Sequence, residues 1–345
     1  MNSGLPPFTR RKFLQYMGMG ALSAFFPHDV PDQPLAFSDG PSGDTPLGRV
    51  CSNQAFIHKE PDKESPQVTF MRFDDIFRLP ETITALDYQK KTRHWYKLAE
   101  NRYLDAALVQ PVFNRPNNPE GKIYPWGILG EITVPLTHIY TWPLIGWTAR
   151  KVYFSNTFWV LRRVFDEKGD AWYELMDDYD GNSFFVAASA VRLVPLEELK
   201  ALSPEVPPDQ KRLEVNLGEQ RVRAFEYGRQ VFDTLVSTGA GKGLTPTGTF
   251  ASSRKRPCRH MVNELAGGQR TYDLLGVPWV SYIDTNGVAF HGAYWHSNWG
   301  NTMSSGCINM RPEDAKWIYL WSDPNVPFNA YQYQQPAGTR VDVIE

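Results

Sequence analysis

Apolar and polar residues alternate along much of the chain in short runs, and turn residues separate these runs. Residues 211–217, 221–227 and 230–236 alternate in this way, with only two or three residues between successive runs. Alternation with a period of two is typical of a half-buried strand, and connections of this length are typical of β-hairpins. The pattern predicts a β meander that begins at residue 211.

One helix is predicted near the end of the chain. Pro312 suits a first-turn position, and the two acidic residues that follow it lie where the helix dipole favours negative charge. Ala315, Ile318 and Tyr319 then recur at helical spacing.

Two blocks of short strand-like runs, residues 48–115 and 125–197, precede the meander and repeat one pattern. The tetrad Trp-Tyr-Lys-Leu that begins at Trp95 is echoed by Trp-Tyr-Glu-Leu at Trp172. Each tetrad lies late in its block and is followed by a turn-prone stretch and an apolar run. Two small β-barrel modules are the simplest interpretation, and they resemble bacterial Src-homology-type barrels that hold peptide or glycan ligands. The aromatic residues could equally fill small β cores without any ligand.

Two segments with few apolar residues divide the chain. Residues 28–47 are rich in proline, aspartate, glycine and serine, which predicts a flexible tether. Residues 198–210 contain closely spaced prolines, which predicts a linker and a domain boundary before residue 211.

The amino-terminal segment, residues 1–27, has the features of an export signal. The pair Arg10-Arg11 is followed by Phe-Leu and by a short apolar run without acidic residues, a pattern that resembles the signal of the twin-arginine route. We therefore expect an extracytoplasmic location, in the cell wall or a periplasm-like space. The apolar run is short for a membrane span, and cleavage and retention as a single N-terminal membrane anchor both stay open.

Composition narrows the class of protein. The 36 basic and 38 acidic residues nearly cancel, so the bulk charge does not suggest a nucleic-acid-binding surface. Aromatic residues make up 14%, beside 27 Pro and 26 Gly, a mixture that suits short strands and many turns. The fold class expected is mostly β, with two small barrel modules followed by a β-sandwich domain that carries a short helix.

The three cysteines, Cys51, Cys258 and Cys307, cannot all pair within one chain. Outside the cytoplasm Cys51 and Cys258 could form a disulfide, although the sequence gives no distance between them. At least one thiol is therefore left over.

Cys307 is the strongest candidate for chemistry. It lies in Ser-Ser-Gly-Cys-Ile-Asn, and His291-Gly292 precede it by 16 residues at the end of a strand-like run. An imidazole within hydrogen-bond reach can convert a thiol into a thiolate nucleophile. Gly306 would let a carbonyl carbon approach the backbone, whose amides could stabilise an oxyanion. No acid is close in sequence, so a backbone carbonyl is expected to orient the imidazole.

The wider pattern resembles the YkuD-type L,D-transpeptidase catalytic domain over residues 211–345. The shared motifs are His-Gly at 291–292, Ser-x-Gly-Cys-Ile-Asn at 304–309, Ser-Thr-Gly at 237–239 and Thr-Pro-Thr-Gly-Thr-Phe at 245–250.

The resemblance implies a reaction on peptidoglycan stem peptides. The Cys307 thiolate attacks the carbonyl of the third, diamino residue, D-alanine leaves, and an amine of a neighbouring stem resolves the thioester into a 3→3 cross-link. His291 is then the proton acceptor and donor, the Gly292 carbonyl orients it, and Gly306 with Cys307 frames the oxyanion hole. The resemblance further implies acylation of Cys307 by carbapenems, and it implies no metal and no organic cofactor.

Several neighbouring residues have two interpretations. Many members of the family carry a basic residue where this chain has Ser305, which puts a second basic group beside the thiol in doubt. His296 is a rival base to His291. Other residues of the segment either contact substrate or only shape and pack the site: Tyr294, Trp295, Trp299, Ser304, Asn309 and Arg311. His260 and Cys258 lack the further ligands that a zinc site needs.

Two other functions stay open. Transfer of the same acyl group to water would make a peptidoglycan L,D-carboxypeptidase or endopeptidase. Alternatively, the chain would be a non-catalytic wall-binding protein whose modules hold wall polymer.

Overall fold

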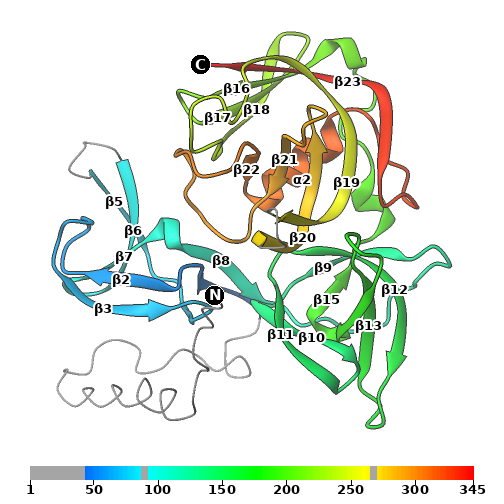
Figure 1. Cartoon of the computed structure of the whole chain (residues 1–345), viewed down its shortest axis with the longest axis horizontal. Helices are drawn as coiled ribbons and strands as arrows, with labels where there is room; N and C mark the ends of the chain where they lie inside the picture. The colour runs from blue at the N-terminus through cyan, green and yellow to red at the C-terminus, as the bar shows by residue number, and fades with distance from the viewer. Residues whose placement is uncertain (1–42, 87–91, 265–269) are drawn as a thin grey trace, which may run out of the picture. The chain divides into compact units, whose positions relative to one another are not determined.

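The computed structural model describes residues 43–86, 92–264 and 270–345 (Figure 1). The predicted signal or anchor and residues 28–42 of the predicted tether lie outside this part. Residues 43–47, the end of the predicted tether, belong to strand β1, because their backbone pairs with β8 and Leu47 is buried. No helix within the described ranges has the length and hydropathy that a membrane span needs.

The first block forms two sheets around its own core. A five-stranded sheet has the order β3-β2-β7-β6-β5, and a three-stranded sheet has the order β4-β1-β8. The strands are β1 (Gly43–Val50), β2 (Gln54–His58), β3 (Gln67–Arg72), β4 (Ile76–Arg78), β5 (Thr82–Leu86), β6 (Thr92–Ala99), β7 (Arg102–Asp105) and β8 (Val109–Asn114), with the 3-10 helix η2 (Ala106–Leu108) before β8.

The second block forms one seven-stranded sheet of order β11-β10-β14-β13-β12-β9-β15. Its elements are β9 (Ile128–Ile132), β10 (Leu136–Trp142), β11 (Ile145–Tyr153), β12 (Thr157–Phe165), β13 (Ala171–Met176), β14 (Ser183–Ala187), the 3-10 helix η3 (Ala188–Ala190) and β15 (Val191–Leu193).

The two blocks repeat a succession of elements. Trp95 lies on β6, which is followed by β7, η2 and β8, and Trp172 lies on β13, which is followed by β14, η3 and β15. Both indole rings are buried, and the tyrosines that follow them, Tyr96 and Tyr173, lie in the core clusters of their blocks. The expectation of barrels needs correction, because no pairing between described strands closes any of these sheets. The reason in the first block is that β1 pairs with β4 and β8 alone, which divides the strands between two sheets.

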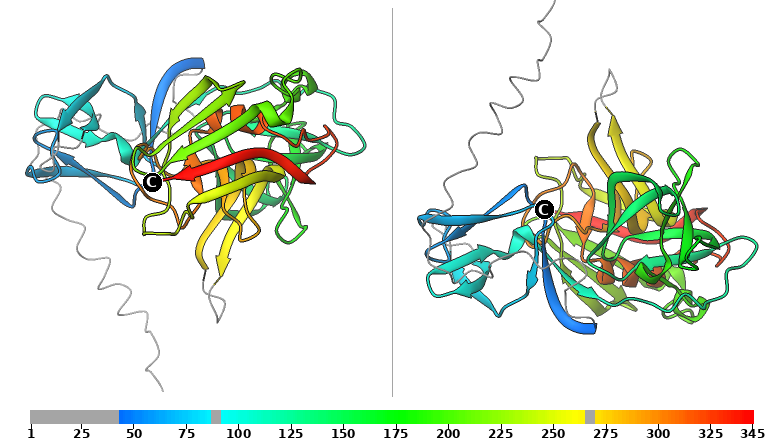
Figure 2. Two further views of the ribbon diagram at one scale, coloured as in Figure 1. Left: turned by 90° about the horizontal axis from the view of Figure 1, so that it is seen from above. Right: turned by 90° about the horizontal axis from the view of Figure 1, so that it is seen from below.

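The C-terminal domain is an eight-stranded sheet of order β18-β17-β16-β23-β19-β20-β21-β22 (Figure 1). Its strands are β16 (Lys211–Asn216), β17 (Arg221–Glu226), β18 (Arg229–Leu235), β19 (Gly248–Glu264), β20 (Arg270–Tyr282), β21 (Ala289–Gly292), β22 (Ile308–Met310) and β23 (Tyr333–Ile344). The predicted meander is confirmed as β16, β17 and β18, which pair antiparallel in sequence order. The long β19–β20 hairpin projects beyond the other strands of the sheet (Figure 2).

The predicted helix is confirmed as α2 (Pro312–Trp321), with Pro312 in its first turn. Ala315, Ile318 and Tyr319 are buried against the sheet. Two buried lysines satisfy carbonyls at its C-terminal end, where the helix dipole favours cations: Lys255 donates to Tyr319 (2.7 Å), and Lys211 donates to the Trp321 carbonyl (3.0 Å).

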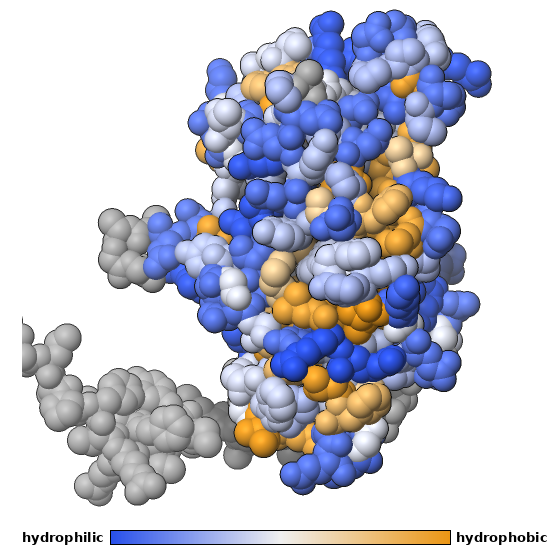
Figure 3. All heavy atoms as spheres, turned by 90° about the vertical axis from the view of Figure 1, so that its right-hand side faces the viewer, coloured by the Kyte–Doolittle hydropathy of each residue, from blue (hydrophilic) through white to orange (hydrophobic). Residues whose placement is uncertain are grey.

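The linker predicted at 198–210 is packed against the domain that follows it. It contains the end of η4 (Leu196–Leu199) and all of η5 (Pro208–Gln210), and the Leu202 amide donates to the Leu320 carbonyl at the end of α2 (2.9 Å). One core cluster also joins Leu129 and Trp159 of the second block to the C-terminal domain. On the face drawn in Figure 3, apolar side chains gather in patches between hydrophilic ones.

Candidate active site

Cys307 and His291 lie at two short strands that pair in parallel: His291 belongs to β21, and Cys307 directly precedes β22. Residues of β21 pair with those of β22 in the register Phe290 with Ile308 and His291 with Asn309. Continuing this register by one residue sets Cys307 opposite Ala289, and Ala289 shares a face of its strand with His291. With strands about 4.8 Å apart and a rise of about 3.3 Å per residue, the Cα atoms of Cys307 and His291 lie roughly 8 Å apart on one face.

The imidazole of His291 is oriented by the backbone. Its side chain is buried, at 2% exposure, and Nδ1 lies 3.2 Å from the Gly292 carbonyl oxygen. A carbonyl only accepts, so Nδ1 carries the proton and Nε2 keeps a free lone pair. Burial lowers the pKa of His291 to about 4, although the Gly292 hydrogen bond opposes this shift. His291 is therefore neutral at pH 7 and able to accept a proton.

Burial also has the largest effect on the pKa of the Cys307 thiol. It raises the pKa of Cys307 above its ordinary value, against a hydrogen bond from the Ala289 amide that lowers it. The thiol donates to the Gly287 carbonyl at 3.7 Å. In this arrangement burial favours the neutral form of both groups, whereas the thiolate predicted from the sequence requires the imidazole within hydrogen-bond reach of the thiol.

The loop before Cys307 is shaped by Ser304 and Gly306. Gly306 has φ +139°, and a Cβ there would lie 2.7 Å from the Leu244 carbonyl oxygen, so only glycine fits. Its amide, expected from the sequence to serve the oxyanion hole, donates to the Ser304 hydroxyl (3.0 Å), which in turn donates to the Cys307 carbonyl. Ser304 therefore shapes the turn, while the neighbouring Ser305 is exposed.

His296, the rival base, has no free nitrogen. Its Nδ1 accepts from the Asn298 amide (3.2 Å), and its Nε2 lies 2.9 Å from the side-chain amide of Asn309. Its side chain is 1% exposed, and burial, with a smaller effect from His291, lowers its pKa to about 3. Asn309 also exchanges both backbone hydrogen bonds with Ser237, so it fixes the chain after Cys307.

The aromatic residues after His291 differ in their environments. Tyr294, assigned from the sequence to the substrate groove, is buried: its hydroxyl donates to the Leu275 carbonyl (3.0 Å), and its ring stacks on Tyr153 at 5.5 Å. Trp295 packs in the same apolar cluster as Cys307, and its ring centroid lies 5.7 Å from that of His291.

Trp299 lies on the other side of His296, with a centroid separation of 4.9 Å. The guanidinium of Arg311 lies 5.5 Å from the Trp299 ring centroid and 3.6 Å from the Asp314 carboxylate. The Arg311 guanidinium thus already has two partners at the start of α2, Trp299 and Asp314.

The β19–β20 hairpin and the first block bring further side chains to this region that the sequence did not predict. Tyr282 packs in the Cys307 cluster, and the guanidinium of Arg254 lies 3.9 Å over its ring. Arg49 of β1 donates to the Tyr294 carbonyl at 2.6 Å. These contacts join residues far apart in sequence, so no local motif announces them.

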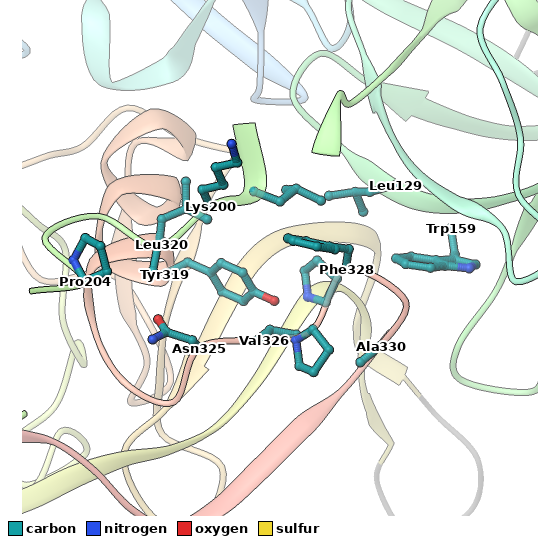
Figure 4. Close-up of a pocket in the computed structure, with 14 residues that line it drawn as sticks. Leu129, Trp159, Lys200, Pro204, Tyr319, Leu320, Asn325, Val326, Phe328 and Ala330 are labelled. Atoms are coloured by element: carbon teal, nitrogen blue, oxygen red, sulfur yellow. The ribbon is translucent and has the colours of Figure 1, made fainter. Parts of the chain in front are cut away.

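An apolar cavity of about 510 Å³ lies between the second block and the C-terminal domain, away from Cys307. Trp159, Tyr319 and Phe328 line it, with Phe328 between the other two rings in the view of Figure 4. All three cysteines are free thiols, so Cys51 and Cys258 do not pair in this structure.

Residues 210–343 match the family model of the YkuD L,D-transpeptidase catalytic domain. Over this segment the chain is similar to that family. Among curated proteins, none matches the chain.

Solved structures similar to this chain include L,D-transpeptidases of three bacteria. The L,D-transpeptidase from Mycobacterium smegmatis is 24% identical, with 39% of this chain and 59% of that chain covered and a TM-score of 0.32. The catalytic domain of the Enterococcus faecium enzyme is 24% identical, with 39% and 96% covered and a TM-score of 0.31. L,D-transpeptidase 3 from Mycobacterium tuberculosis is 18% identical, with 50% and 78% covered and a TM-score of 0.32.

Proposed function

We propose that this chain is an exported peptidoglycan L,D-transpeptidase of cell wall biogenesis, with Cys307 as nucleophile and His291 as general acid and base. The observation that supports the proposal is the β21–β22 register, whose extension by one residue sets Cys307 opposite Ala289, two positions before His291, within the segment that matches the YkuD model. The Gly292 carbonyl adds to it, because it leaves Nε2 of His291 free to accept a proton.

In the first step, Cys307 attacks the carbonyl carbon of the third residue of a stem peptide. Sγ forms the new bond while its proton passes to Nε2 of His291, so no thiolate has to exist beforehand in the desolvated site. The tetrahedral intermediate then collapses, the bond to D-alanine breaks, and the departing nitrogen takes the proton from His291. A thioester on Cys307 remains.

In the second step, an amine of a neighbouring stem attacks the thioester. It gives a proton to His291, forms the amide of a 3→3 cross-link, and releases the Cys307 sulfur, which recovers the proton. Water in place of the amine would yield a shortened stem, as in an L,D-carboxypeptidase or endopeptidase. The N-terminal blocks would hold wall polymer near the site.

The resting position of the thiol hydrogen has a consequence for this reaction. The thiol donates its hydrogen to the Gly287 carbonyl, so the Cys307 side chain has to turn toward His291 before proton transfer. Substrate bound beside Cys307 would compete with this hydrogen bond and favour the turn.

Incubating purified protein with muropeptides tests the proposal. We expect cross-linked dimers from the wild type and none from Cys307→Ala, with Cys258→Ala as a control that removes a different, buried thiol. A carbapenem should add its mass to the peptide that contains Cys307. Shortened stems without dimers would identify hydrolysis, and a wild type that forms no product and no adduct would indicate a wall-binding protein.

Export is tested separately. Replacing the pair by Arg10→Lys and Arg11→Lys should retain the chain in the cytoplasm if the twin-arginine route is used. Unchanged fractionation of the double variant would contradict this part of the proposal.

A further inference from the structure

Arg49, at the end of strand β1, is a buried arginine whose guanidinium donates four hydrogen bonds. Its side chain is 1% exposed. Nη1 donates to the Asp74 carboxylate (2.9 Å), Nε and Nη2 donate to the Gln110 side-chain oxygen (3.1 and 2.9 Å), and the guanidinium carbon lies 4.1 Å from the Tyr153 ring centroid. A buried guanidinium is tolerated when its charge is paired and its donors are satisfied.

A further hydrogen bond of Arg49 connects the first block to the C-terminal domain. Nη2 also donates to the Tyr294 carbonyl at 2.6 Å, across 245 positions in sequence. The Cys51 thiol lies 3.6 Å from the same oxygen. Two side chains of the first block thus hold the peptide group that joins Tyr294 to Trp295.

The orientation of that peptide group bears on the reacting pair. Tyr294 follows β21 by two residues, and its ring is fixed by the Leu275 hydrogen bond and the stack on Tyr153. With the ring fixed, the Tyr294 carbonyl determines the direction in which the chain continues to Trp295. Trp295 contacts the His291 ring and packs in the cluster of Cys307. Its position therefore determines how far water is excluded from the imidazole and the thiol.

An arginine is needed at this position. Its planar fork reaches Asp74, Gln110 and the Tyr294 carbonyl at the same time, whereas a lysine ammonium is a compact point charge on a flexible stem. Asp74 is itself held in place by Lys151 of the second block (2.9 Å). The guanidinium therefore joins side chains of both N-terminal blocks to the loop after His291.

We propose that Arg49 is a positioning residue for the Cys307–His291 pair, acting through the Tyr294 carbonyl and Trp295. Its effect on acylation rests on the proposed function, but its effect on the environment of His291 does not. The N-terminal blocks would then do more than hold a ligand, because the first block completes the wall of the reacting pair.

The test compares Arg49→Met and Arg49→Lys with Arg78→Met, which removes an exposed arginine from β4 of the same sheet. The titration of His291 is followed by NMR of histidine-labelled full-length protein, with the signal assigned through His291→Gln. The rate of Cys307 alkylation against pH is followed by mass spectrometry of the peptide that contains it. Circular dichroism checks the fold.

In Arg49→Met we expect water to reach His291, so that its pKa rises from about 4 by at least about one pH unit toward the ordinary value, because desolvation is the cause of its depression. The pH midpoint of Cys307 alkylation should fall. Acylation of Cys307 by a carbapenem should slow by ~10-fold or more, since small misplacements of reacting groups are costly. In Arg49→Lys the His291 pKa, the pH midpoint of alkylation and the acylation rate should lie between those of Arg49→Met and the wild type. In Arg78→Met all three should equal the wild-type values.

A folded Arg49→Met whose His291 and Cys307 titrate as in the wild type overturns the inference. If Arg49→Met does not fold, a folded Arg49→Lys with wild-type titration overturns it equally. A wild type that is never acylated, combined with a shifted His291 titration in the variants, would reject the proposed function and keep the inference. Normal acylation in every variant, together with an unchanged His291 titration, would keep the proposed function and reject the inference.

Discussion

At the scale of single residues, burial dominates the pKa values of the proposed catalytic pair, Cys307 and His291. Desolvation lowers the pKa of His291 and raises that of Cys307, so both groups are neutral near pH 7. A neutral imidazole with its Nδ1 proton on a carbonyl can accept a proton at Nε2, and a neutral thiol reacts more slowly with electrophiles than a thiolate does.

The depressed pKa values of His291 and His296 predict sensitivity to acid. Both are lower in the folded chain, at about 4 and about 3, than the ordinary value of 6.5, so the unfolded chain binds protons more readily. Their stabilisation is complete above pH 6.5 and is lost as the pH falls toward 4. On lowering the pH from 7 to 4.5, each histidine should reduce the free energy of unfolding by about 2 to 3 kcal/mol.

Urea unfolding at these two pH values measures this loss. In His296→Gln the loss of unfolding free energy should be smaller than in the wild type by about the contribution of one histidine, about 2 to 3 kcal/mol. Equal losses in the two proteins would contradict the assignment.

Gly306 gives a second prediction at this scale. Gly306→Ala places a Cβ 2.7 Å from the Leu244 carbonyl at φ +139°, whereas Gly243→Ala has φ +77° and meets no atom within 4 Å. Both variants pay for backbone strain of about 1 to 3 kcal/mol, but only Gly306→Ala adds a clash with backbone. Urea unfolding should rank Gly306→Ala as the less stable, and Cys307 alkylation should change in that variant alone.

Contacts within a few positions of the motif could be predicted from the sequence, and distant ones could not. His291 lies beside Gly292, and Ser304 reaches Cys307 across three positions, so the motif itself carries these relations. The burial of Tyr294 depends on Tyr153 and Arg49, which approach from other sheets. Periodicity contains no information about such partners.

At the scale of elements, a charged cluster joins the β13–β14 turn to the β19–β20 hairpin. His260 of β19 lies between Asp177 (2.8 Å) and Asp273 (2.6 Å). Asp178 accepts from Arg256 and Arg259, each at 2.9 Å. The hairpin that borders Cys307 is thus held to the second block by alternating charges.

This cluster predicts a loosening at alkaline pH. Burial alone would lower the pKa of His260, but its hydrogen bonds to Asp177 and Asp273 raise it above the ordinary value. A raised pKa gives stabilisation that is complete below pH 6.5 and is lost as the pH rises through the folded value.

Hydrogen exchange should therefore show the turn at residues 177–182 less protected at pH 9 than at pH 6, after correction for the intrinsic rate. In His260→Gln this extra pH dependence should disappear. A wild type with the same protection at both values would contradict a charged His260.

The sequence predicted some elements better than others for a physical reason. The β16–β18 meander alternates regularly and was predicted. β19 and β20 were not, because their pairing shifts register between Arg259 and Met261 and again near Glu264, and such irregularities break the period of two.

At the scale of the whole molecule, the second block and the C-terminal domain share a core. Leu129 and Trp159 of the second block lie in one cluster with Val215 and Ile318 of the C-terminal domain. The sequence predicted separate modules with a linker between them, because short proline-rich segments look alike whether they are free or packed. A shared core makes these two parts one cooperative unit.

Calorimetry of Trp159→Ala tests this unity. Trp159 is 3% exposed, so its truncation should cost about 3 to 5 kcal/mol, and the second block and C-terminal domain should still unfold in one transition. Trp142→Ala, at a side chain that is 49% exposed and packs edge-on against Phe185, should lower the unfolding free energy by less, about 1 to 2 kcal/mol. A separate early transition of the second block alone would contradict the shared core.

The position of β23 has a consequence for biosynthesis. This final strand lies between β16 and β19, parallel to the first and antiparallel to the second. While the ribosome still holds it, the emerging sheet has two unsatisfied edges where its middle should be, and these edges can capture other chains. Prematurely terminated translation products would therefore lack a finished domain, and proteases and chaperones could distinguish them from the completed polypeptide.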